Sequence, residues 1–282
     1  MTSLDISNND IGLQAVEEGW RSRDNDGLPP FVHTDGRELR EDPQGSPSME
    51  GVIAICKAIS TMASLAKIDI SNSNLRPEGA KVLAEKLKEN STLQELNIAG
   101  NLLSFKSDAE AWDDFYTDLS GILAISKVIP TLRALVAFDI SNNDIRAEGG
   151  QALAKALMNN NIMTSLNISD NFMACKETGE ALADMLKVNT VLKELDISRK
   201  YDRYDDKAYS NSSFADELAA GIRANGTLEK LTISGDEWGW EEGSKNSKPF
   251  TIETSMTEAD FNSKFIGTSG AIMLASFLPK CK

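Results

Sequence analysis

Histidine and cysteine are scarce in this chain, and their scarcity excludes several kinds of site. The sequence contains one histidine, His33, and its three cysteines, Cys56, Cys175 and Cys281, stand far apart with no C-x-x-C pair. Such spacing indicates neither a disulfide framework nor a zinc site. Reduced thiols are typical of the cell interior, so we expect an intracellular protein, in the cytoplasm or inside an organelle, with no cofactor.

Long apolar runs and basic residues are also in short supply. No stretch approaches the ~20 apolar residues that a membrane span needs, and the first residues do not resemble a signal peptide. The 29 basic residues face 43 acidic ones, which gives a net charge of -14. Nucleic acids and anionic lipids bind to lysine and arginine, so this balance argues against both and suits a basic protein partner.

Catalytic motifs are missing as well. The sequence has no nucleophile elbow, P-loop, HExxH motif or dinucleotide-binding glycine motif in a suitable context. Asp24 and Asp26 are spaced as at the start of a calcium loop, but Asp35 stands where the loop needs glutamate. We therefore predict no catalytic residue, no metal ligand and a non-enzymatic protein.

What the sequence does contain is a repeat, and one complete unit begins at Leu135. Leu135, Phe138 and Ile140 have the spacing of a short leucine-rich strand, and Asn143 marks the turn after it. An apolar pattern at helical spacing follows the turn. The next unit begins 28 residues after the first, at Met163.

The middle apolar residue of the predicted strand recurs in seven units. These residues are Leu4, Ile68, Leu96, Phe138, Leu166, Leu195 and Leu231. Asparagine occupies the turn in four units, at Asn9, Asn101, Asn143 and Asn171. An amide both donates and accepts hydrogen bonds, so we predict that these four hold the turn backbone. A strand and a helix that are each apolar on one side must stack on further copies to bury that side, which predicts a solenoid.

The pattern resembles the ribonuclease-inhibitor-like class of leucine-rich repeats, in which strands and α-helices alternate. The resemblance implies a single α/β horseshoe over residues 1–282, with parallel strands on the concave face and helices on the convex face. It also implies a platform for protein–protein interaction, as a scaffold or a fixed subunit of a larger assembly. Ran GTPase-activating proteins have a similar repeat, so a GTPase-activating regulator is one alternative. The recognition domain of a longer sensor is another.

Four units carry insertions, each between the end of a strand and the start of a helix. They cover approximately residues 10–46, 102–120, 200–213 and 236–269. Equivalent positions of successive units lie on one side of a solenoid, so we expect all four on one rim. Insertions that share a rim often mark the binding face.

Every tryptophan and tyrosine of the chain lies in these insertions. They are Trp20, Trp112, Tyr116, Tyr201, Tyr204, Tyr209, Trp238 and Trp240. Tryptophan and tyrosine dominate the binding energy of protein interfaces, so all eight are candidates for partner contact. They are equally suited to anchoring each insertion on its own repeats, and both interpretations stay open. Trp238 and Trp240 flank a glycine and are the better partner candidates, whereas Trp112 and Tyr116 have the spacing of an internally packed helix.

The concave face and the chain ends give weaker predictions. Small polar residues, mainly aspartate, asparagine and serine, follow the middle position of each strand, so we expect a solvated, acidic concave face in a supporting role. In the last insertion, residues 250–252 predict a short strand, and Thr257 predicts the cap of a helix carrying Phe261 and Phe265. The chain begins on a strand and ends after a helix without obvious polar caps, so we also expect end-to-end contacts with neighbouring subunits.

Overall fold

A computed structural model gives the fold for residues 1–9, 11, 50–62, 64–88, 90–104, 117–199, 212–234, 249–262, 264 and 266–281. In these residues strands and helices alternate along the chain. The strands are β1 (Ser3–Asp5), β2 (Lys67–Asp69), β3 (Glu95–Asn97), β4 (Ala137–Asp139), β5 (Ser165–Asn167), β6 (Glu194–Asp196), β7 (Lys230–Ile233) and β8 (Phe250–Glu253). The α-helices are α1 (Glu50–Thr61), α2 (Arg76–Leu87), α3 (Ser120–Val128), α4 (Arg146–Leu157), α5 (Lys176–Val188), α6 (Ser212–Ala224) and α7 (Gly267–Phe277). Short 3-10 helices follow α3 (Ile129–Thr131) and α7 (Leu278–Lys280).

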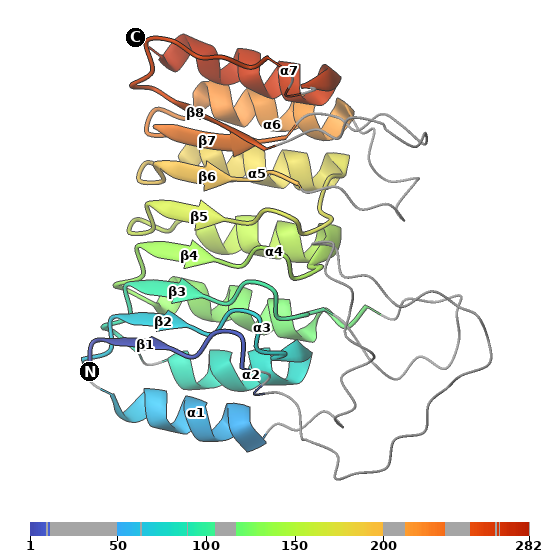
Figure 1. Cartoon of the computed structure of the whole chain (residues 1–282). Helices are drawn as coiled ribbons and strands as arrows, with labels where there is room; N and C mark the ends of the chain where they lie inside the picture. Colours follow the sequence, from blue (N-terminus) through green and yellow to red (C-terminus); the bar gives the residue numbers. More distant parts are fainter. Residues whose placement is uncertain are drawn as a thin grey trace, which may run out of the picture.

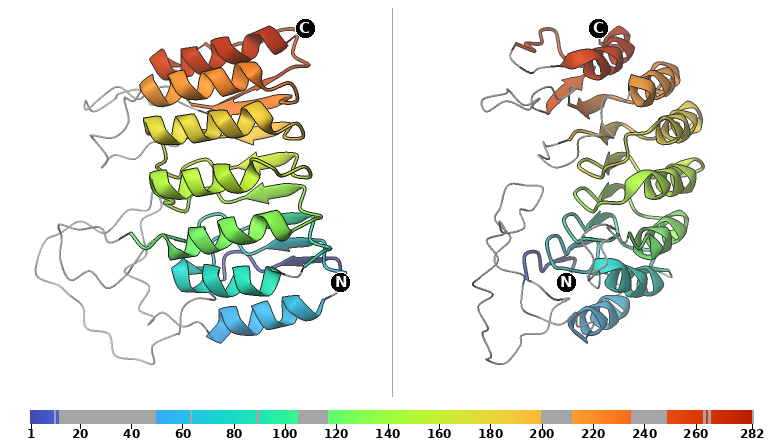
Figure 2. Two further views of the ribbon diagram at one scale, coloured as in Figure 1. Left: turned by 180° about the vertical axis from the view of Figure 1, so that it is seen from behind. Right: turned by 90° about the vertical axis from the view of Figure 1, so that its right-hand side faces the viewer.

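The elements form two layers, a sheet and a row of helices on one of its faces (Figure 1). The described strands make one sheet in the order β1 to β8, and the pairs from β1 to β7 are all parallel. Figure 2 shows that the helix layer bows outward, so the sheet lines the concave side of the stack. This is the α/β leucine-rich solenoid that the repeat pattern predicts.

The register of the sheet follows the sequence repeat residue for residue. Phe138 of β4 pairs with Leu166 of β5, and Leu96 of β3 pairs with Phe138. Each of these middle residues is at most 2% exposed and faces the helices, while the flanking residues of each strand face away from them. Together with Leu135 and Ile140, which lie just outside β4 and are also buried, this middle residue packs the unit onto the core.

The core runs without interruption from α1 to α7. Helical leucines and isoleucines pack between consecutive strands, and the residues at most 1% exposed include Leu83, Leu87, Ile125, Leu153, Leu157, Leu182, Leu186, Leu218 and Ile222. Replacing one such residue by alanine lowers the free energy of unfolding by about 2–5 kcal/mol. Each unit of a solenoid contacts only its two neighbours, so these buried residues hold the units together. Leu4, in β1 at one end of the sheet, is only partly buried because it has a neighbouring strand on one side.

Close approach of the helices depends on small residues. A Cβ atom added to Gly221 of α6 would lie 2.4 Å from the Cα atom of Ala183 in α5. That distance is far inside van der Waals contact, so α5 and α6 can approach this closely only because position 221 carries no side chain.

The last strand differs from the others in direction. Residues 250–252, predicted as a strand, belong to β8, which pairs antiparallel with β7 at the C-terminal end of the sheet. The hydroxyl groups of Thr232 and Thr251 hydrogen-bond across this pair at 2.9 Å.

The prediction of a helix capped by Thr257 is wrong, because the described residues from 254 to 262 contain no helix. The Met256 N–H donates to the Glu253 carbonyl and closes a turn directly after β8. Further on, the Phe261 ring packs on Phe250, with 5.1 Å between ring centroids. This tertiary contact fixes Phe261 beside the strand and overrides the local helical pattern. Phe265 lies outside the described residues.

Candidate functional site

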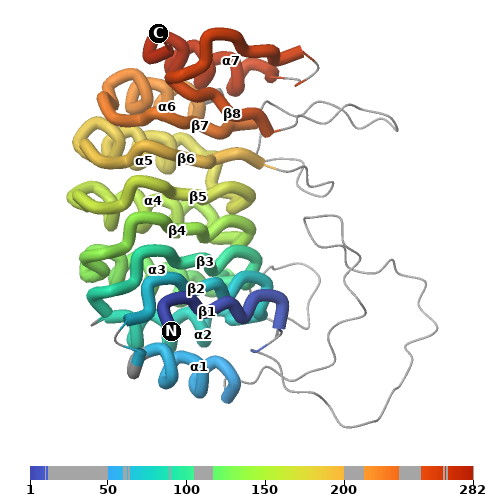
Figure 3. Tube along the Cα trace, turned by 60° about the vertical axis from the view of Figure 1, so that its left-hand side comes forward, coloured from blue at the N-terminus to red at the C-terminus, as the bar shows by residue number. Residues whose placement is uncertain are grey.

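The edge of the sheet where parallel strands end and helices begin is the first candidate. We call it the strand-to-helix edge, and it contains residues 6–9, 70–75, 98–104, 140–145, 168–175 and 197–199. Each of the four sequence insertions follows a strand that ends at this edge, and these strands are β1, β3, β6 and β7 (Figures 1 and 3). The opposite edge, here the helix-to-strand edge, carries short connections such as residues 158–164 and 189–193, and β8 also ends there because it runs antiparallel to β7.

The turn asparagines form a buried ladder along the strand-to-helix edge. The Asn143 side-chain amide donates to the carbonyls of Ile98, in the preceding unit, and Ile140, in its own unit, at 2.9 and 3.0 Å. Its Oδ1 atom accepts the Asn101 N–H at 2.8 Å, and Asn171 repeats the arrangement by accepting the Asn143 N–H at 2.8 Å. Each side chain therefore satisfies buried backbone groups of two consecutive units.

Asn101 and Asn9 mark the N-terminal part of this ladder. Asn101 Oδ1 accepts the Ser73 N–H at 2.9 Å, and its amide donates to the Ile70 carbonyl at 2.8 Å. Asn9, in the first unit, is exposed and donates to the nearby Ser7 carbonyl at 2.8 Å. The ladder is thus strongest in the middle of the stack.

Left-handed backbone accompanies the ladder in each of the first five units. The residue directly before the turn position has a φ between 51° and 65°, and these residues are Asn8, Asn72, Gly100, Asn142 and Asp170. Asparagine, aspartate and glycine are the residue types that adopt this conformation at low cost. The residue type before each turn was therefore a sequence signal for left-handed backbone. The strand and turn pattern alone did not reveal it.

Further left-handed residues on the same edge are of less tolerant types. Leu102 and Phe172 have φ of 56° and 51°, and the arginines that begin α2 and α4, Arg76 and Arg146, have φ of 55° and 58°. A left-handed conformation costs such residues about 1–2 kcal/mol each. Among the described residues, every non-glycine with positive φ lies at this edge or at the helix start that adjoins it.

Arg146 links two units on this edge. Its Nε atom lies 2.7 Å from Asp144 Oδ1, and its Nη2 atom donates to Asp144 Oδ2 at 3.1 Å. The guanidinium carbon stands 5.4 Å from the centre of the Phe172 ring in the next unit. The edge thus presents an ordered arginine, a carboxylate and an aromatic ring between the attachment points of the second and third insertions.

The concave face is a second candidate, and its polar groups are largely used within the sheet. Asp139 Oδ1 accepts from both the N–H and the hydroxyl of Ser141, at 2.9 and 2.7 Å. Asp139 Oδ2 accepts the side-chain amide of Asn167 on the next strand at 2.8 Å. Asp69 is bound in the same way by Ser71 and by Asn97. These carboxylates therefore have few lone pairs left free for a ligand.

The charge of this face is strongly negative. Seven acidic residues and two lysines lie on the described strands: Asp5, Asp69, Glu95, Asp139, Glu194, Asp196, Glu253, Lys67 and Lys230. The two lysines pair with neighbouring glutamates, Lys67 with Glu95 at 2.6 Å and Lys230 with Glu253 at 4.0 Å. Hydrogen bonds from Ser7 hold the pKa of Asp5 below its ordinary value. The net charge of the described strands is therefore negative, which favours a basic partner on this side.

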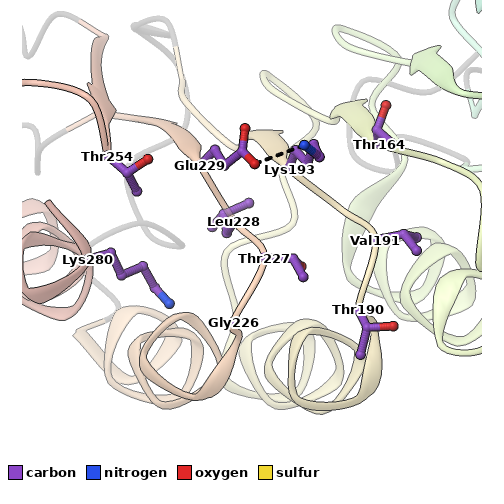
Figure 4. Close-up of a pocket in the computed structure, with 10 residues that line it drawn as sticks. All are labelled: Thr164, Thr190, Val191, Lys193, Gly226, Thr227, Leu228, Glu229, Thr254 and Lys280. Atoms are coloured by element: carbon purple, nitrogen blue, oxygen red, sulfur yellow. Dashed lines mark hydrogen bonds and ion pairs between the residues drawn. The ribbon is translucent and has the colours of Figure 1, made fainter. Parts of the chain in front are cut away.

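A groove of about 780 Å³ lies at the helix-to-strand edge near the C-terminal end of the stack (Figure 4). Lys193 and Glu229 pair across it at 2.9 Å, and the Thr227 hydroxyl donates to the Leu192 carbonyl at 3.0 Å. The Lys280 ammonium group donates to the Asn225 carbonyl just beyond α6, and burial lowers the pKa of Lys280. The polar groups of the groove therefore hold the end of the solenoid together, and its described lining has no histidine, cysteine or serine.

A second column of asparagines, which the sequence analysis did not predict, binds backbone groups at the helix-to-strand edge. Asn189 Oδ1 accepts the N–H groups of Val191 and Leu192 at 3.0 and 2.9 Å, and its amide donates to the Leu157 carbonyl at 3.1 Å. Asn225 makes the equivalent contacts one unit later. An asparagine shortly after α2, α4, α5 and α6, three residues before the first apolar residue of the next unit, was the available signal.

Cysteines and acidic residues give no further site in the described part of the chain. No group of three histidine, cysteine, aspartate or glutamate side chains is placed to hold a metal ion there. Burial raises the pKa of the Cys56 thiol to about 11, so this thiol is unreactive near neutral pH. None of the described helices is both long and apolar enough to span a membrane.

The aromatic candidates of the insertions fall outside the described residues. This holds for all eight, which are Trp20, Trp112, Tyr116, Tyr201, Tyr204, Tyr209, Trp238 and Trp240. Their role in partner contact stays a prediction.

Comparisons with known proteins agree with the repeat architecture. The family model described as Leucine Rich repeat matches residues 1–17 and 131–154. A solved structure titled "Leiomodin-1 Actin-Binding Site 2 (ABS2)" is 19% identical, with 63% of this chain and 91% of that chain covered and a TM-score of 0.43. A Caenorhabditis elegans tropomodulin C-terminal domain is 13% identical, with 61% and 92% covered and the same TM-score of 0.43. At these values neither structure assigns a partner to this chain. The recurring strand and turn pattern and the stacked units show an α/β solenoid of the leucine-rich repeat type, and the family model matches two parts of it.

Proposed function

We propose that this protein is a non-catalytic platform for protein–protein interaction that holds its partner at the strand-to-helix edge. The observation that carries the proposal is the common attachment of all four insertions at this edge (Figure 1). The insertions contain every tryptophan and tyrosine of the chain, the residue types that dominate binding hot spots, so their common attachment supports a binding role for this rim. Trp238 and Trp240 are the residues we expect to contribute most.

The geometry of the edge supports this assignment. Left-handed residues of unfavourable type, such as Leu102 and Phe172, are concentrated there. Strained backbone is found preferentially at functional sites, because the surrounding structure must be selected to hold it. Arg146, stacked on Phe172, adds a residue type that is enriched in binding hot spots.

The concave face takes a supporting part in the proposal. Its aspartates are engaged by neighbouring serines and asparagines, so it offers the partner negative charge more than free hydrogen-bonding groups. A charge pattern of this kind orients a basic partner and speeds its association. The 28-residue alternation of strand and helix supports assignment of the repeats to the ribonuclease-inhibitor-like class.

A crosslinking pull-down from native extract tests the proposal. The intact chain is compared as bait with the Trp238→Ala/Trp240→Ala variant, after circular dichroism has shown that both fold alike. Val188→Ala on the exposed side of α5, where Val188 is 54% exposed, is the control for loss of a surface apolar side chain. We expect a stoichiometric protein partner with the intact bait and the control, and at least a tenfold loss with the double variant.

Two results would contradict this assignment. Capture of a partner that is unaffected by the double variant would move the binding site away from these tryptophans. Recovery of a small GTPase whose turnover rises on addition of the protein would replace the platform by the alternative of a GTPase-activating regulator.

A further inference from the structure

A second hollow lies where the strand-to-helix edge meets the C-terminal end of the sheet. Its volume is about 350 Å³, and its lining comes from β7, β8 and the segment after β8. Phe250, at the first position of β8, pairs with Ile233, the last residue of β7, so this lining residue lies at the edge where the fourth insertion begins. This volume lies at the lower end of the range of ligand pockets, about 300–1,000 Å³.

One part of the wall of the hollow is apolar and includes Phe250, Met256 and Phe261. The Phe261 ring, partly exposed, packs at 57° on the Phe250 ring and is fixed by that contact. Met256 is partly exposed as well, and its flexible thioether adjusts to the shape of an entering side chain. Thr232 and Thr251 also line the hollow, and their hydroxyl groups hydrogen-bond to each other at 2.9 Å, so one of the two O–H donors is already satisfied.

The rim of the hollow is acidic. Glu258 and Asp260 are exposed at its mouth, with Lys264 as the basic lining residue. The neighbouring concave face adds Asp196 of β6 and further strand carboxylates, so the field around the hollow is negative. An apolar centre inside a charged rim is the usual arrangement of a protein-binding hot spot.

We propose that this hollow receives an apolar side chain, of leucine size, from a basic segment of the protein partner. The inference rests on the proposed platform function and names the chemistry of what the platform binds. The leucine-sized group enters between Met256 and Phe261, and flanking lysines or arginines lie against Glu258 and Asp260.

Fluorescence anisotropy with three labelled peptides tests the proposal on the full chain. The first probe has a central leucine with two lysines on each side, the second replaces the leucine by serine, and the third replaces the lysines by glutamates. We expect the leucine–lysine peptide to bind about tenfold or more tightly than either of the others, because it alone satisfies both the apolar hollow and the acidic rim.

Charge reversal at the rim supplies a matched pair of variants. Glu258→Lys/Asp260→Lys changes exposed residues of the hollow, whereas Glu85→Lys/Asp184→Lys makes the same change in net charge on α2 and α5. We expect the first variant to weaken the leucine–lysine peptide about tenfold and the second to change it less than twofold. Equal losses from both variants would overturn the proposal, since they would reveal attraction by net charge alone.

Methyl NMR locates the bound peptide independently of affinity. With labelled methionine methyl groups, the Met256 signal should shift on addition of the leucine–lysine peptide, while the buried Met185 and Met273 signals stay in place. Phe261→Ala should reduce the shift, and unchanged Met185 and Met273 signals would show that this variant still folds. An unshifted Met256 signal at millimolar peptide would overturn the proposal. The platform function fails separately, when the intact bait captures no stoichiometric partner.

Discussion

The two edges of the solenoid are both held by asparagine, but they treat the chain differently. At the strand-to-helix edge, Asn143 and Asn171 bind backbone groups of the preceding unit and of their own strand end. At the helix-to-strand edge, the Asn189 amide donates to the carbonyl of Leu157, the last residue of α4 in the preceding unit. Its side-chain oxygen accepts the N–H groups of Val191 and Leu192, just before β6. The first ladder is complete before the chain leaves the sheet, whereas the second spans the whole connection.

This difference explains why the insertions share one edge. Beyond Asn101 the chain can lengthen before α3 begins without breaking a hydrogen bond of the ladder. After Asn189, by contrast, Leu192 must follow within three residues, because its N–H binds the same side-chain oxygen. Variation is therefore tolerated at the edge that we propose as the binding site and is restricted at the opposite edge.

Lengthening a connection at the helix-to-strand edge should cause the largest loss of stability. Eight glycine and serine residues inserted between Asn189 and Thr190 should separate Asn189 Oδ1 from its two N–H donors, and we expect a loss of about 4 kcal/mol or more in the free energy of unfolding. The same eight residues inserted between Lys245 and Asn246 should lower the free energy of unfolding by about 0.6 kcal/mol, since they lengthen the fourth insertion. Urea unfolding followed by circular dichroism measures both; equal losses would refute the comparison.

Removal of one ladder amide should have the next largest effect. Asn143→Ala leaves the Ile98 carbonyl, the Ile140 carbonyl and the Asn101 N–H without this partner, and we expect a loss of about 3–4 kcal/mol. Asn142→Gly is the control, because glycine accepts the φ of 55° at this position. A change below about 1 kcal/mol in both variants by urea denaturation would show that the ladder is not a major source of stability.

Helix packing behind the edges gives a smaller effect. Gly221→Ala places a Cβ atom against the α5 backbone, and we expect a loss of about 1–3 kcal/mol from the forced separation of α5 and α6. Gly226→Ala, at the helix-to-strand edge, has no atom within 4 Å of the new Cβ and should be close to neutral. Thermal unfolding of the two variants compares them directly, and equal melting temperatures would show that α5 and α6 are less tightly packed than the distances indicate.

The local pairs on the concave face should matter least. Ser7→Ala removes the hydroxyl that binds Asp5 Oδ1, so the pKa of Asp5 should rise toward its ordinary value, as followed by carboxyl NMR. Because the folded pKa is lowered, the stabilisation by this carboxylate is present above its ordinary pKa and is lost as the pH falls through the folded pKa. Ser64→Ala, whose hydroxyl binds the Met1 carbonyl, should leave the Asp5 pKa unchanged. An Asp5 pKa that is the same with and without the Ser7 hydroxyl would show that this hydrogen bond does not lower it.

Much of the fold follows from local pattern, and the exceptions have a common physical origin. The spacing of Leu135, Phe138 and Ile140 predicts the strand, the buried side and the stacking, because each depends on the chain's own periodicity. The antiparallel pairing of β8 and the position of Phe261 depend on contacts with β7 and Phe250, and no local pattern carries that information.

The candidate site divides in the same way. The edge that bears the insertions follows from unit lengths alone, as do the turn positions of Asn101, Asn143 and Asn171. The stacking of Arg146 on Phe172 and the hollow beside Met256 depend on side-chain placement between units, so they became visible only in three dimensions.

Amide hydrogen exchange of the captured complex shows directly which edge of the solenoid the partner covers. The protein is compared free and bound to its native partner, with peptides that cover residues 105–116, 200–211 and 235–248 and peptides that cover the helix-to-strand edge at residues 158–164 and 189–193. We predict slower exchange on binding in the first set and no change in the second. Slower exchange confined to the helix-to-strand edge would contradict the claim that this protein binds its partner through the insertion-bearing edge.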